Sequence, residues 1–586
     1  MFKTLRLILI LILVAMVLQT TMGAQPLRPA IQWIPQDAVI SLELSNSKAL
    51  LDLFAGEKAV EFITSLPAYR KQTSNPKFRE FLGIVAYLEA TLGTDWRTAL
   101  TKLTGGGITF AVCPEDTVIL IVEAEDEQML NQLHETFLNL TKDEARKQSQ
   151  PDRVASKQYR DVTAWTFDGK EAHAIIGKRF VLCNRSEGLK AVLDRRAGAG
   201  EASLASKSTY RMAKSKIGSG AVATVFADLK LLKQIPDVAE LLERPRKNPM
   251  AALAFAGIVE SIRDSNWLAL GLDIRDSTLV LQPLVDGKTV AQTNPASFAL
   301  PKEAGDGATP NLSVPRRIAA MTLYRDLHQF YAAKDELFPE RTSGLIFFEN
   351  MMGIFFSGRD LTSEVLAETH PSLRFVVAEQ EFDPAVGTPQ IKLPAFAVIL
   401  RLRNPEQAKE VAEEAWQKAL GLINFTRGQQ ALPGLIIDRL VHNQTKFSMA
   451  YFSTADIEDK TRLDTRFNIR PSLAMPGDYL ILSSADGLAR DLIDALKHEK
   501  ERTVEAVAET HSLLEIEGGR LASILQANRG VLVRGDMVKK GSTQEQAEAG
   551  IDLLITVVRL IERIKLSIGM HEGLTRARLE MKLNIQ

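Results

Sequence analysis

An internal repeat limits the folds open to this chain more than any other feature of its sequence. Residues 177–183 read GKRFVLC and are followed by SEGL at residues 186–189. Residues 477–482 read GDYLIL and are followed by ADGL at residues 485–488. Further matches keep the same order on both sides, so the sequence predicts a tandem duplication of one large unit.

Both copies are predicted to open with a strand that follows a proline. Pro35 precedes an alternating stretch at residues 39–44, and Pro315 precedes a similar stretch at residues 318–323. Alternation of this kind is typical of a strand with one buried face. The two openings therefore place the start of each copy near these prolines.

The pattern of elements favours an α+β fold class. Each copy alternates paired strands with single helices, and many strands have one polar face. This favours an antiparallel sheet with helices packed on one face over a doubly wound parallel sheet, whose strands are apolar on both faces. We predict repeat domains at residues 30–290 and 313–586, joined by an exposed linker at residues 291–312 that is rich in Ala, Pro and Gly.

Two helix starts are marked by capping residues. Asn404 and Pro405 are predicted to be the N-cap and the first helical residue of one long helix. Ser542 and Glu545 are predicted to cap the last long helix. The residues of this last helix that are predicted to face the core recur at helical spacing: Ile551, Leu554, Val558 and Ile561.

The N-terminal segment has the features of a signal peptide. Lys3 and Arg6 precede an apolar run at residues 7–18, and small residues follow up to Ala24. The run is shorter than the roughly 20 residues that cross a bilayer. We predict a signal peptide at residues 1–24, an extracytoplasmic protein that is periplasmic or secreted, and no stable transmembrane span after cleavage. An uncleaved N-terminal anchor is the alternative.

Charge and cysteine content restrict the partners and the covalent chemistry. A net charge of -1 removes the basic surface that nucleic-acid binding needs, so nucleic acid is excluded as a partner. The two cysteines, Cys113 and Cys183, both lie in the first copy. An exported location permits a disulfide between them, while buried free cysteines in strands are the alternative.

The histidines do not show a metal-binding spacing. Metal sites on helices need pairs such as His-Glu-x-x-His, and the sequence has none. We therefore predict histidines that lie at the surface or make a single hydrogen bond, and no metal site. The eight histidines are His134, His173, His328, His370, His442, His498, His511 and His571.

The serines do not show a hydrolase motif. The chain lacks a Gly-x-Ser-x-Gly nucleophile turn. Ser45 and Lys48 have a Ser-x-x-Lys spacing, but the second copy carries Arg325 and His328 at the aligned positions. We therefore interpret Ser45 or Ser47 as a helix cap rather than as a catalytic nucleophile.

A run of three glycines and four matched acids are also interpreted as structural rather than functional residues. Residues 105–107 are three glycines in front of a strand, whereas a phosphate-binding loop leads into a helix. A tight turn is therefore predicted there. Asp95 and Asp360 match between the copies, as do Glu187 and Asp486, and each acid stands at a predicted helix start. The sequence thus predicts no catalytic, cofactor-binding or metal-binding residue, and no cofactor.

One resemblance is carried by the N-terminus and the modules together. The signal peptide, the opening with Pro35, Asp37 and Ala38, and the repeated strand-helix modules resemble exported bacterial protein families catalogued as domains of unknown function. The resemblance implies an extracytoplasmic location and duplicated α+β modules. It carries over no catalytic residue.

The functional hypothesis follows from shared packing and unshared polar residues. We expect an exported, non-catalytic binding or scaffold protein of the cell envelope, with a ligand or envelope partner bound in the cleft between the two copies. A hydrolase of the envelope with a site made of scattered residues is one alternative. A carrier or chaperone of apolar cargo is the other.

The predicted export is tested at the N-terminus of the mature protein. When the chain is expressed with its native N-terminus, sequencing of the purified protein is expected to start near Ala24 or Gln25, because small residues follow the apolar run. Fractionation is expected to recover this form outside the cytoplasm. Recovery of the chain with Met1 from a soluble cytosolic fraction would contradict export.

Overall fold

Two compact units make up the chain. The computed structural model describes residues 28–65, 69, 73, 75–167, 169–198, 202–218, 220–243, 248–255, 258–286, 295–303, 305–502 and 504–584. The predicted signal peptide lies outside these residues. The first unit contains the described residues up to Leu241 and Ser265–Val285, and the second contains Leu242–Asp264 and Asp286–Asn584.

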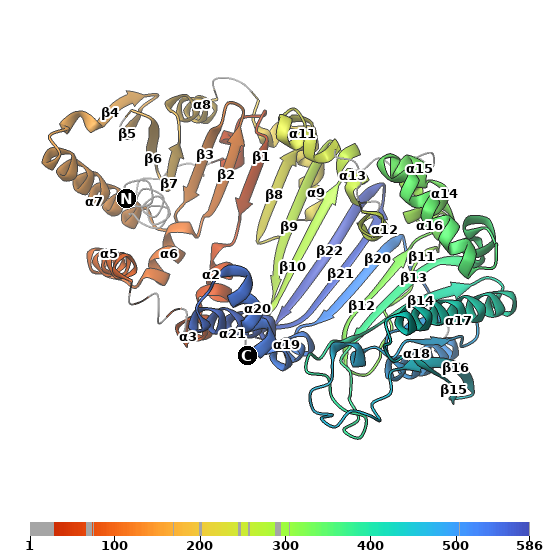
Figure 1. Cartoon of the computed structure of the whole chain (residues 1–586). Helices are drawn as coiled ribbons and strands as arrows, with labels where there is room; N and C mark the ends of the chain where they lie inside the picture. Colours follow the sequence, from red (N-terminus) through yellow and green to blue (C-terminus); the bar gives the residue numbers. More distant parts are fainter. Residues whose placement is uncertain are drawn as a thin grey trace. The chain divides into compact units, whose positions relative to one another are not determined.

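The first unit is built on an antiparallel sheet, which Figure 1 shows in red to yellow. Its strands lie in the following spatial order: β4 (Val154–Tyr159), β5 (Val162–Phe167), β6 (Glu171–Ile176), β7 (Arg179–Cys183), β3 (Thr117–Glu123), β2 (Gly107–Cys113), β1 (Ile40–Leu44), β8 (Ala223–Asp228), β9 (Trp267–Arg275) and β10 (Thr278–Val285).

The second unit is built on another antiparallel sheet. Its strands lie in the following spatial order: β15 (Ile436–His442), β16 (Thr445–Tyr451), β17 (Ser472–Ala474), β18 (Tyr479–Ser483), β14 (Ala395–Leu402), β13 (Thr369–Ala378), β12 (Arg317–Tyr324), β20 (Thr510–Glu517), β21 (Ile561–His571) and β22 (Leu574–Leu583). A short separate pair joins β11 (Gly307–Ala308) to β19 (Val507–Ala508).

The two sheets share one strand order. The first strand of each of these sheets, β1 or β12, lies between the next strand in sequence, β2 or β13, and the strand β8 or β20. In each unit, the hairpin at the edge of the sheet that begins the spatial order above, β4–β5 or β15–β16, has a two-residue loop. Both loop residues have positive φ, at Arg160 and Asp161 in the first unit and at Asn443 and Gln444 in the second.

Helices occupy the connections between the strands. Those of the first unit are α2 (Ser47–Ala55), α3 (Glu57–Ser65), α5 (Pro76–Leu92), α6 (Trp96–Thr104), α7 (Glu127–Lys147), α8 (Ser186–Arg196), α9 (Ser208–Ile217), α10 (Leu229–Leu232) and α11 (Pro236–Glu243), which crosses the unit boundary. Those of the second are α12 (Pro249–Phe255), α13 (Ile258–Asp264), α14 (Leu327–Ala332), α15 (Lys334–Leu337), α16 (Thr342–Phe355), α17 (Pro405–Gln429), α18 (Asp486–Arg502), α19 (Gly518–Ala527), α20 (Arg529–Lys540) and α21 (Gln544–Leu560).

The α+β class is confirmed, but the prediction that helices pack on one face is wrong for the second unit. Ile399 and Leu400 are neighbours on β14 and must point to opposite faces. Ile399 packs in a cluster with Leu492 and other residues of α18. Leu400 packs in a cluster that includes residues of α14 and α15. Helices therefore cover both faces, because the central strands are apolar on both sides.

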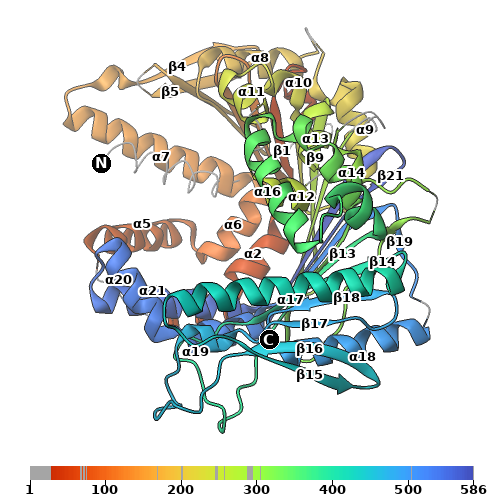
Figure 2. The same cartoon turned by 45° about the vertical axis from the view of Figure 1, so that its right-hand side comes forward.

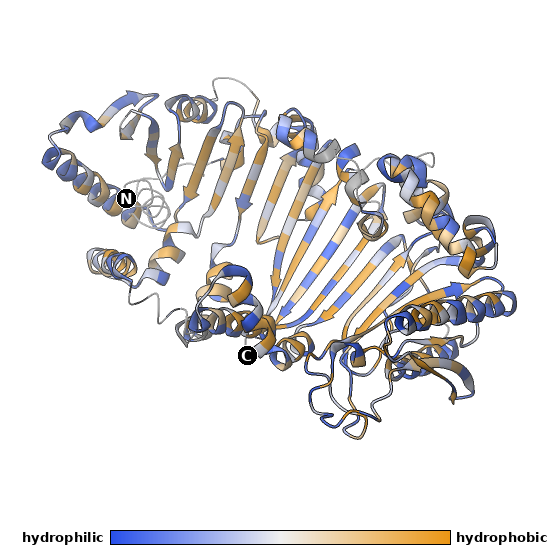
Figure 3. Ribbon diagram, viewed as in Figure 1, coloured by the Kyte–Doolittle hydropathy of each residue, from blue (hydrophilic) through white to orange (hydrophobic). Residues whose placement is uncertain are grey.

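Strands β20, β21 and β22 have a different pattern of apolar and polar residues. Apolar and polar residues alternate along β20, β21 and β22 (Figure 3). The long helix α17 packs through Leu420 and Trp416 against Ala450 of β16, and Figure 2 shows it running over this outer ribbon. Strands β20, β21 and β22 therefore have one polar face, as period-two alternation predicts.

The helix starts agree with the sequence to within a residue. Asn404 is the N-cap of α17 and Pro405 its first residue, although the Asn404 side chain donates a hydrogen bond to Glu368 instead of capping. The last long helix, α21, is capped by a reciprocal pair, Thr543 and Gln546, one residue later than predicted.

The buried face of α21 also differs from the prediction. Leu554, which was predicted to face the core, is exposed, whereas Ile555 is buried together with Ala547. Ile561 is the first residue of β21 instead of the last turn of the helix. The prediction was therefore wrong for Leu554 and Ile561, whereas Ile551 and Val558 are half-buried within the helix.

The segment predicted as an exposed linker contributes to the core of the second unit. Phe298 and Ala299 are buried in the cluster that contains Leu373 of β13. Leu312 is buried in the cluster on the opposite face of the sheet. The segment lacks periodicity because each of these residues fills a separate gap in the core, instead of forming one face of a regular element.

Truncation of a core residue tests the packing of α18. Leu492→Ala is expected to lower the free energy of unfolding by about 2–5 kcal/mol, because Leu492 is fully buried and the change leaves a cavity. Val538→Ala on α20 is the control, since Val538 is 85% exposed, and a change within about 0.5 kcal/mol is expected. Urea titration followed by circular dichroism measures both, and equal effects would contradict this packing.

Candidate functional site

The residues around the Ser45–Lys48 spacing have structural roles at the start of α2. Asn46, rather than Ser45 or Ser47, caps α2 by accepting a hydrogen bond from the backbone N–H of residue 49. The Ser47 hydroxyl donates to the carbonyl of Thr104. Lys48 forms an exposed ion pair with a carboxylate one turn later in the same helix. The prediction that Ser45 or Ser47 is the cap was thus wrong by one residue.

The three glycines form a turn, as predicted. A Cβ atom at Gly105 would lie 2.3 Å from the carboxyl carbon of Glu125, and one at Gly106 would lie 2.8 Å from the carbonyl oxygen of Glu123. Gly107 has a φ of +112°, which side chains rarely tolerate. Close approach of the neighbouring loop therefore explains these glycines without a phosphate ligand.

The paired acids stand at helix starts, as predicted. Backbone N–H groups of Arg97 and Thr98 donate to Asp95, and the backbone N–H of Ser363 donates to Asp360. The hydrogen bonds from Thr98 and Ser363 hold the pKa values of the two carboxyls below their usual range. Glu187 and Asp486 lie in the first turns of α8 and α18.

The two cysteines are buried free thiols. Cys113 on β2 pairs with Thr117 of β3, and Cys183 on β7 pairs with Ile119 of β3. The strand β3 thus lies between them, which favours the alternative without a disulfide. Burial raises the pKa of the Cys113 thiol to about 12 and also raises that of Cys183, so both are poor nucleophiles.

Two of the histidines lie together, which the sequence did not indicate. His134 on α7 and His173 on β6 approach each other in the interior of the first unit. Their sequence separation of 39 residues gives no local spacing signal. Within the described ranges, no group of three or more His, Cys, Asp or Glu side chains is placed to hold a metal ion.

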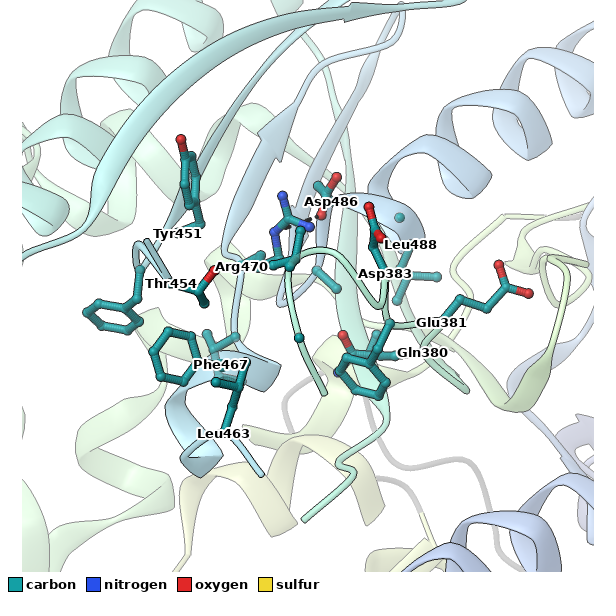
Figure 4. Close-up of a pocket in the computed structure, with 18 of the residues that line it drawn as sticks. Gln380, Glu381, Asp383, Tyr451, Thr454, Leu463, Phe467, Arg470, Asp486 and Leu488 are labelled. Carbon is teal, nitrogen blue, oxygen red and sulfur yellow. Dashed lines mark ion pairs between the residues drawn. The ribbon is translucent and has the colours of Figure 1, made fainter. Parts of the chain in front are cut away.

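A pocket of about 510 Å³ in the second unit is the candidate functional site. The end of β13 and its following loop, the end of β16, the loop before β17 and the start of α18 supply most of its lining (Figure 4). The lining residues are Arg316, Ala378, Glu379, Gln380, Glu381, Phe382, Asp383, Val386, Gly387, Ala395, Ile436, Tyr451, Phe452, Ser453, Thr454, Ala455, Leu463, Phe467, Ile469, Arg470, Ala485, Asp486, Gly487, Leu488 and Asp491.

Charged side chains of both signs meet in this pocket. Arg316 lies 2.5 Å from Glu381 and 3.3 Å from Asp491. Burial raises the pKa of Asp491, although Arg316 favours its charged form. Arg470 lies 3.3 Å from Asp486 at the start of α18, and Figure 4 shows these two side chains side by side. Fixed positive and negative groups are therefore available to a ligand.

Aromatic side chains form one wall of the pocket. The rings of Phe452 and Phe467 meet edge to face with centroids 6.1 Å apart. The guanidinium of Arg466 lies 4.9 Å from the centroid of Phe467, and that of Arg470 lies 5.7 Å from the centroid of Tyr451. The wall therefore offers apolar ring surface next to charged groups.

This arrangement is suited to binding. Among the described lining residues, none is histidine, lysine or cysteine, so the hydroxyls of Ser453 and Thr454 have no general base of these types in the pocket. The site could not be predicted from the sequence because separate loops supply it, apart from Asp486 and its neighbours in the repeated motif. That motif was the only sequence signal that pointed to this place.

The same unit also exposes an apolar helix. Phe347 and Ile354 of α16 are 71% and 70% exposed, and no residue of α16 is buried. Leu422 and Phe425 of the contacting helix α17 are exposed as well. The Lys418 ammonium of α17 donates a hydrogen bond to the carbonyl of Ile354 and links the two helices. These four apolar side chains are called the α16–α17 surface.

None of the helices among the described residues is both long and apolar enough to cross a membrane. No protein-family model matches the chain. No curated protein matches it either.

Among solved structures, the chain shows a weak likeness to three crystal forms of TP0453. Form III has a TM-score of 0.26 at 11% identity, covering 47% of this chain and 85% of that chain. Form IV has a TM-score of 0.24 at 10% identity, covering 45% and 81%. Form I has a TM-score of 0.24 at 12% identity, covering 47% and 84%. Scores of this size carry no inference about a shared fold or function.

Proposed function

We propose that the chain is an exported, non-catalytic binding protein whose ligand occupies the pocket of the second unit. The observation that carries the proposal is a pocket of about 510 Å³ with acids, guanidinium groups and aromatic rings in one lining. Pockets of this size that combine apolar walls with a few polar groups are typical ligand sites. All its lining residues belong to the second unit, so this site replaces the cleft between the copies in the hypothesis.

The lining favours a short peptide or an extended peptide segment as the ligand. The Glu381 carboxylate is suited to cationic groups because it stays 76% exposed beside Arg316. The Asp383 carboxylate is suited to the same groups. Arg470 is suited to a carboxylate because it stays 36% exposed beside Asp486. The rings of Phe452 and Phe467 are suited to apolar side chains. A peptide presents all three kinds of group within a short length.

The other parts of the proposal rest on the N-terminal sequence and on the strand order. The N-terminal segment supports an extracytoplasmic location, and the common strand order of the two sheets supports a tandem duplication. The alternative of a hydrolase would need a nucleophile beside a base. The polar residues of the pocket instead form ion pairs with one another, as between Arg316 and Glu381.

Filling the pocket tests the binding proposal. A Cβ atom at Gly487 would meet nothing within 4 Å, so Gly487→Phe adds a ring to the pocket lining without a clash of its Cβ. Wild-type protein is dialysed to equilibrium against a defined mixture of dipeptides and tripeptides, and the retained peptides are measured by mass spectrometry. Gly487→Phe is expected to lower the retained amount at least about tenfold.

A matched substitution separates pocket filling from general damage. Gly535 on α20 is also open around its Cβ and does not line the pocket, so Gly535→Phe is expected to retain peptides like the wild type. Thermal unfolding midpoints of both variants verify that they are folded. Failure of the wild type to retain any peptide, or equal retention by Gly487→Phe and wild type, would contradict the proposal.

The α16–α17 surface favours a carrier of apolar cargo as the second candidate function. An almost uncharged helix that is apolar on most sides is normally covered. Glu349, the one charged residue of α16, already pairs with Lys334. The exposed rings and aliphatic chains of this surface would then contact an apolar chain such as an acyl group.

Charge introduction tests this second function. Wild-type protein is expected to enhance the emission of a dansyl-labelled fatty acid, and Phe347→Glu with Ile354→Glu is expected to reduce this enhancement by at least about half, because both side chains are largely exposed. Val538→Glu, on an even more exposed apolar side chain of α20, is the control and is expected to leave it unchanged. Equal enhancement of the emission by all three proteins would contradict the carrier function.

A further inference from the structure

A pair of buried histidines joins a helix to the sheet in the first unit. The Nε2 atoms of His134 on α7 and His173 on β6 lie 3.0 Å apart, which is a hydrogen-bond distance. His134 is 9% exposed and His173 is 1% exposed. The bond therefore links α7 to the sheet at a place that water does not reach freely.

The surroundings of the pair are mostly aromatic. Phe167 and Phe180 lie beside His173, with ring centroids 5.0 and 5.6 Å from its own. Trp165 meets His134 edge to face, with centroids 6.1 Å apart. Aromatic rings therefore surround both imidazoles with largely apolar surface.

The charged groups near the pair do not neutralise a cation. The positive charge of Lys142 on α7 disfavours protonation of His134 and so lowers its pKa. The Lys142 ammonium lies 4.9 Å from the ring centroid of Trp165. Glu171 stands two residues before His173 on the same face of β6. Besides burial, the neighbouring His134 lowers the pKa of His173.

Protonation changes this contact in two steps. In the neutral pair, one ring donates its Nε2–H to the bare Nε2 of the other ring. A first added proton leaves one hydrogen bond but places an unpaired charge in the aromatic shell. A second proton removes the remaining acceptor, so two N–H groups and two positive charges then face each other.

We propose that His134 and His173 form an acid-sensitive latch that holds α7 against the sheet of the first unit while both rings are neutral and releases the helix when they are protonated. The latch is independent of the pocket and of its proposed ligand. It is confined to the first unit, because β17, the strand at the equivalent position of the second sheet, contains only Ser472, Leu473 and Ala474.

The direction of the pH dependence follows from burial. Burial lowers the pKa of His134 to about 4 and that of His173 to about 3, from the ordinary value of 6.5. The stabilising effect of the neutral pair is therefore complete above the unfolded-state pKa of 6.5. It decreases as the pH falls below 6.5 and is lost as the pH passes through the two folded-state values. Release of α7 is therefore expected at acidic pH, below 6.5.

Hydrogen exchange of the whole chain tests the latch. Protection of the amides in residues 127–147, corrected for the intrinsic pH dependence of exchange, is expected to fall at least about tenfold between pH 6.5 and pH 4.5 in the wild type. In the double variant His134→Gln with His173→Gln, the side chains cannot titrate in this range, so protection is expected to be the same at both pH values.

A histidine in the other unit is the matched control. His511 is buried, and its pKa is lowered by burial to about 3, but its Nδ1 contacts a serine hydroxyl instead of another histidine. The variant His511→Gln is expected to leave the pH response of residues 127–147 unchanged. Constant protection in the wild type, or an equal loss in the double glutamine variant, would overturn the proposal.

A measurement on the unmodified chain does not depend on how the variants fold. Nitrogen-15 spectra of selectively labelled histidine at pH 7 are expected to show one of the two rings with a protonated Nε2 and the other with a bare Nε2. Two rings that both carry a proton on Nε2 would exclude the shared hydrogen bond and with it the latch.

Discussion

Ile399 and Leu400 are neighbours on β14, yet they pack into two different cores of the second unit. Consecutive residues of a strand point to opposite faces, so both faces of this strand must be apolar, and residues 395–400 are. Helices then have to cover both faces of the sheet, since each face would otherwise expose a large apolar area to water. The placement of α18 on one face and of α14 and α15 on the other follows from this requirement.

The position of α18 in turn creates the candidate site. Its apolar residues, including Leu492, are fixed in the core, and near its C-terminal end Glu499 accepts two hydrogen bonds of 2.9 Å from the buried Arg374 of β13. A buried arginine needs such a partner, because an unpaired charge in the interior is strongly destabilising. With the helix held along its length, its first turn at Asp486 lies against the loops that follow β13 and β16. Core packing thus determines where the pocket forms.

The two units share their strand order but differ in their polar residues. The first unit contains the histidine pair between α7 and β6, and the second contains the pocket with Arg316, Arg470 and Asp486. Apolar positions in a sheet are constrained by their neighbours on both sides, whereas single polar residues at loops or at a helix face are free to change. The proposed binding function and the proposed latch are therefore properties of individual units and not of the repeated design.

Local signals in the sequence determined the α+β class, the repeated motif and the helix starts, because capping and turn formation depend on residues within one or two turns of each other. Asn404 with Pro405, and Asp95 with Asp360, are examples. Tertiary structure alone decided that helices cover both faces, that Phe298 is buried, and that Leu554 is exposed instead of Ile555. It also brought His134 to His173 and assembled the pocket from separate loops. These contacts join residues far apart in the chain, and burial against distant elements leaves no regular spacing in the sequence from which they could be predicted.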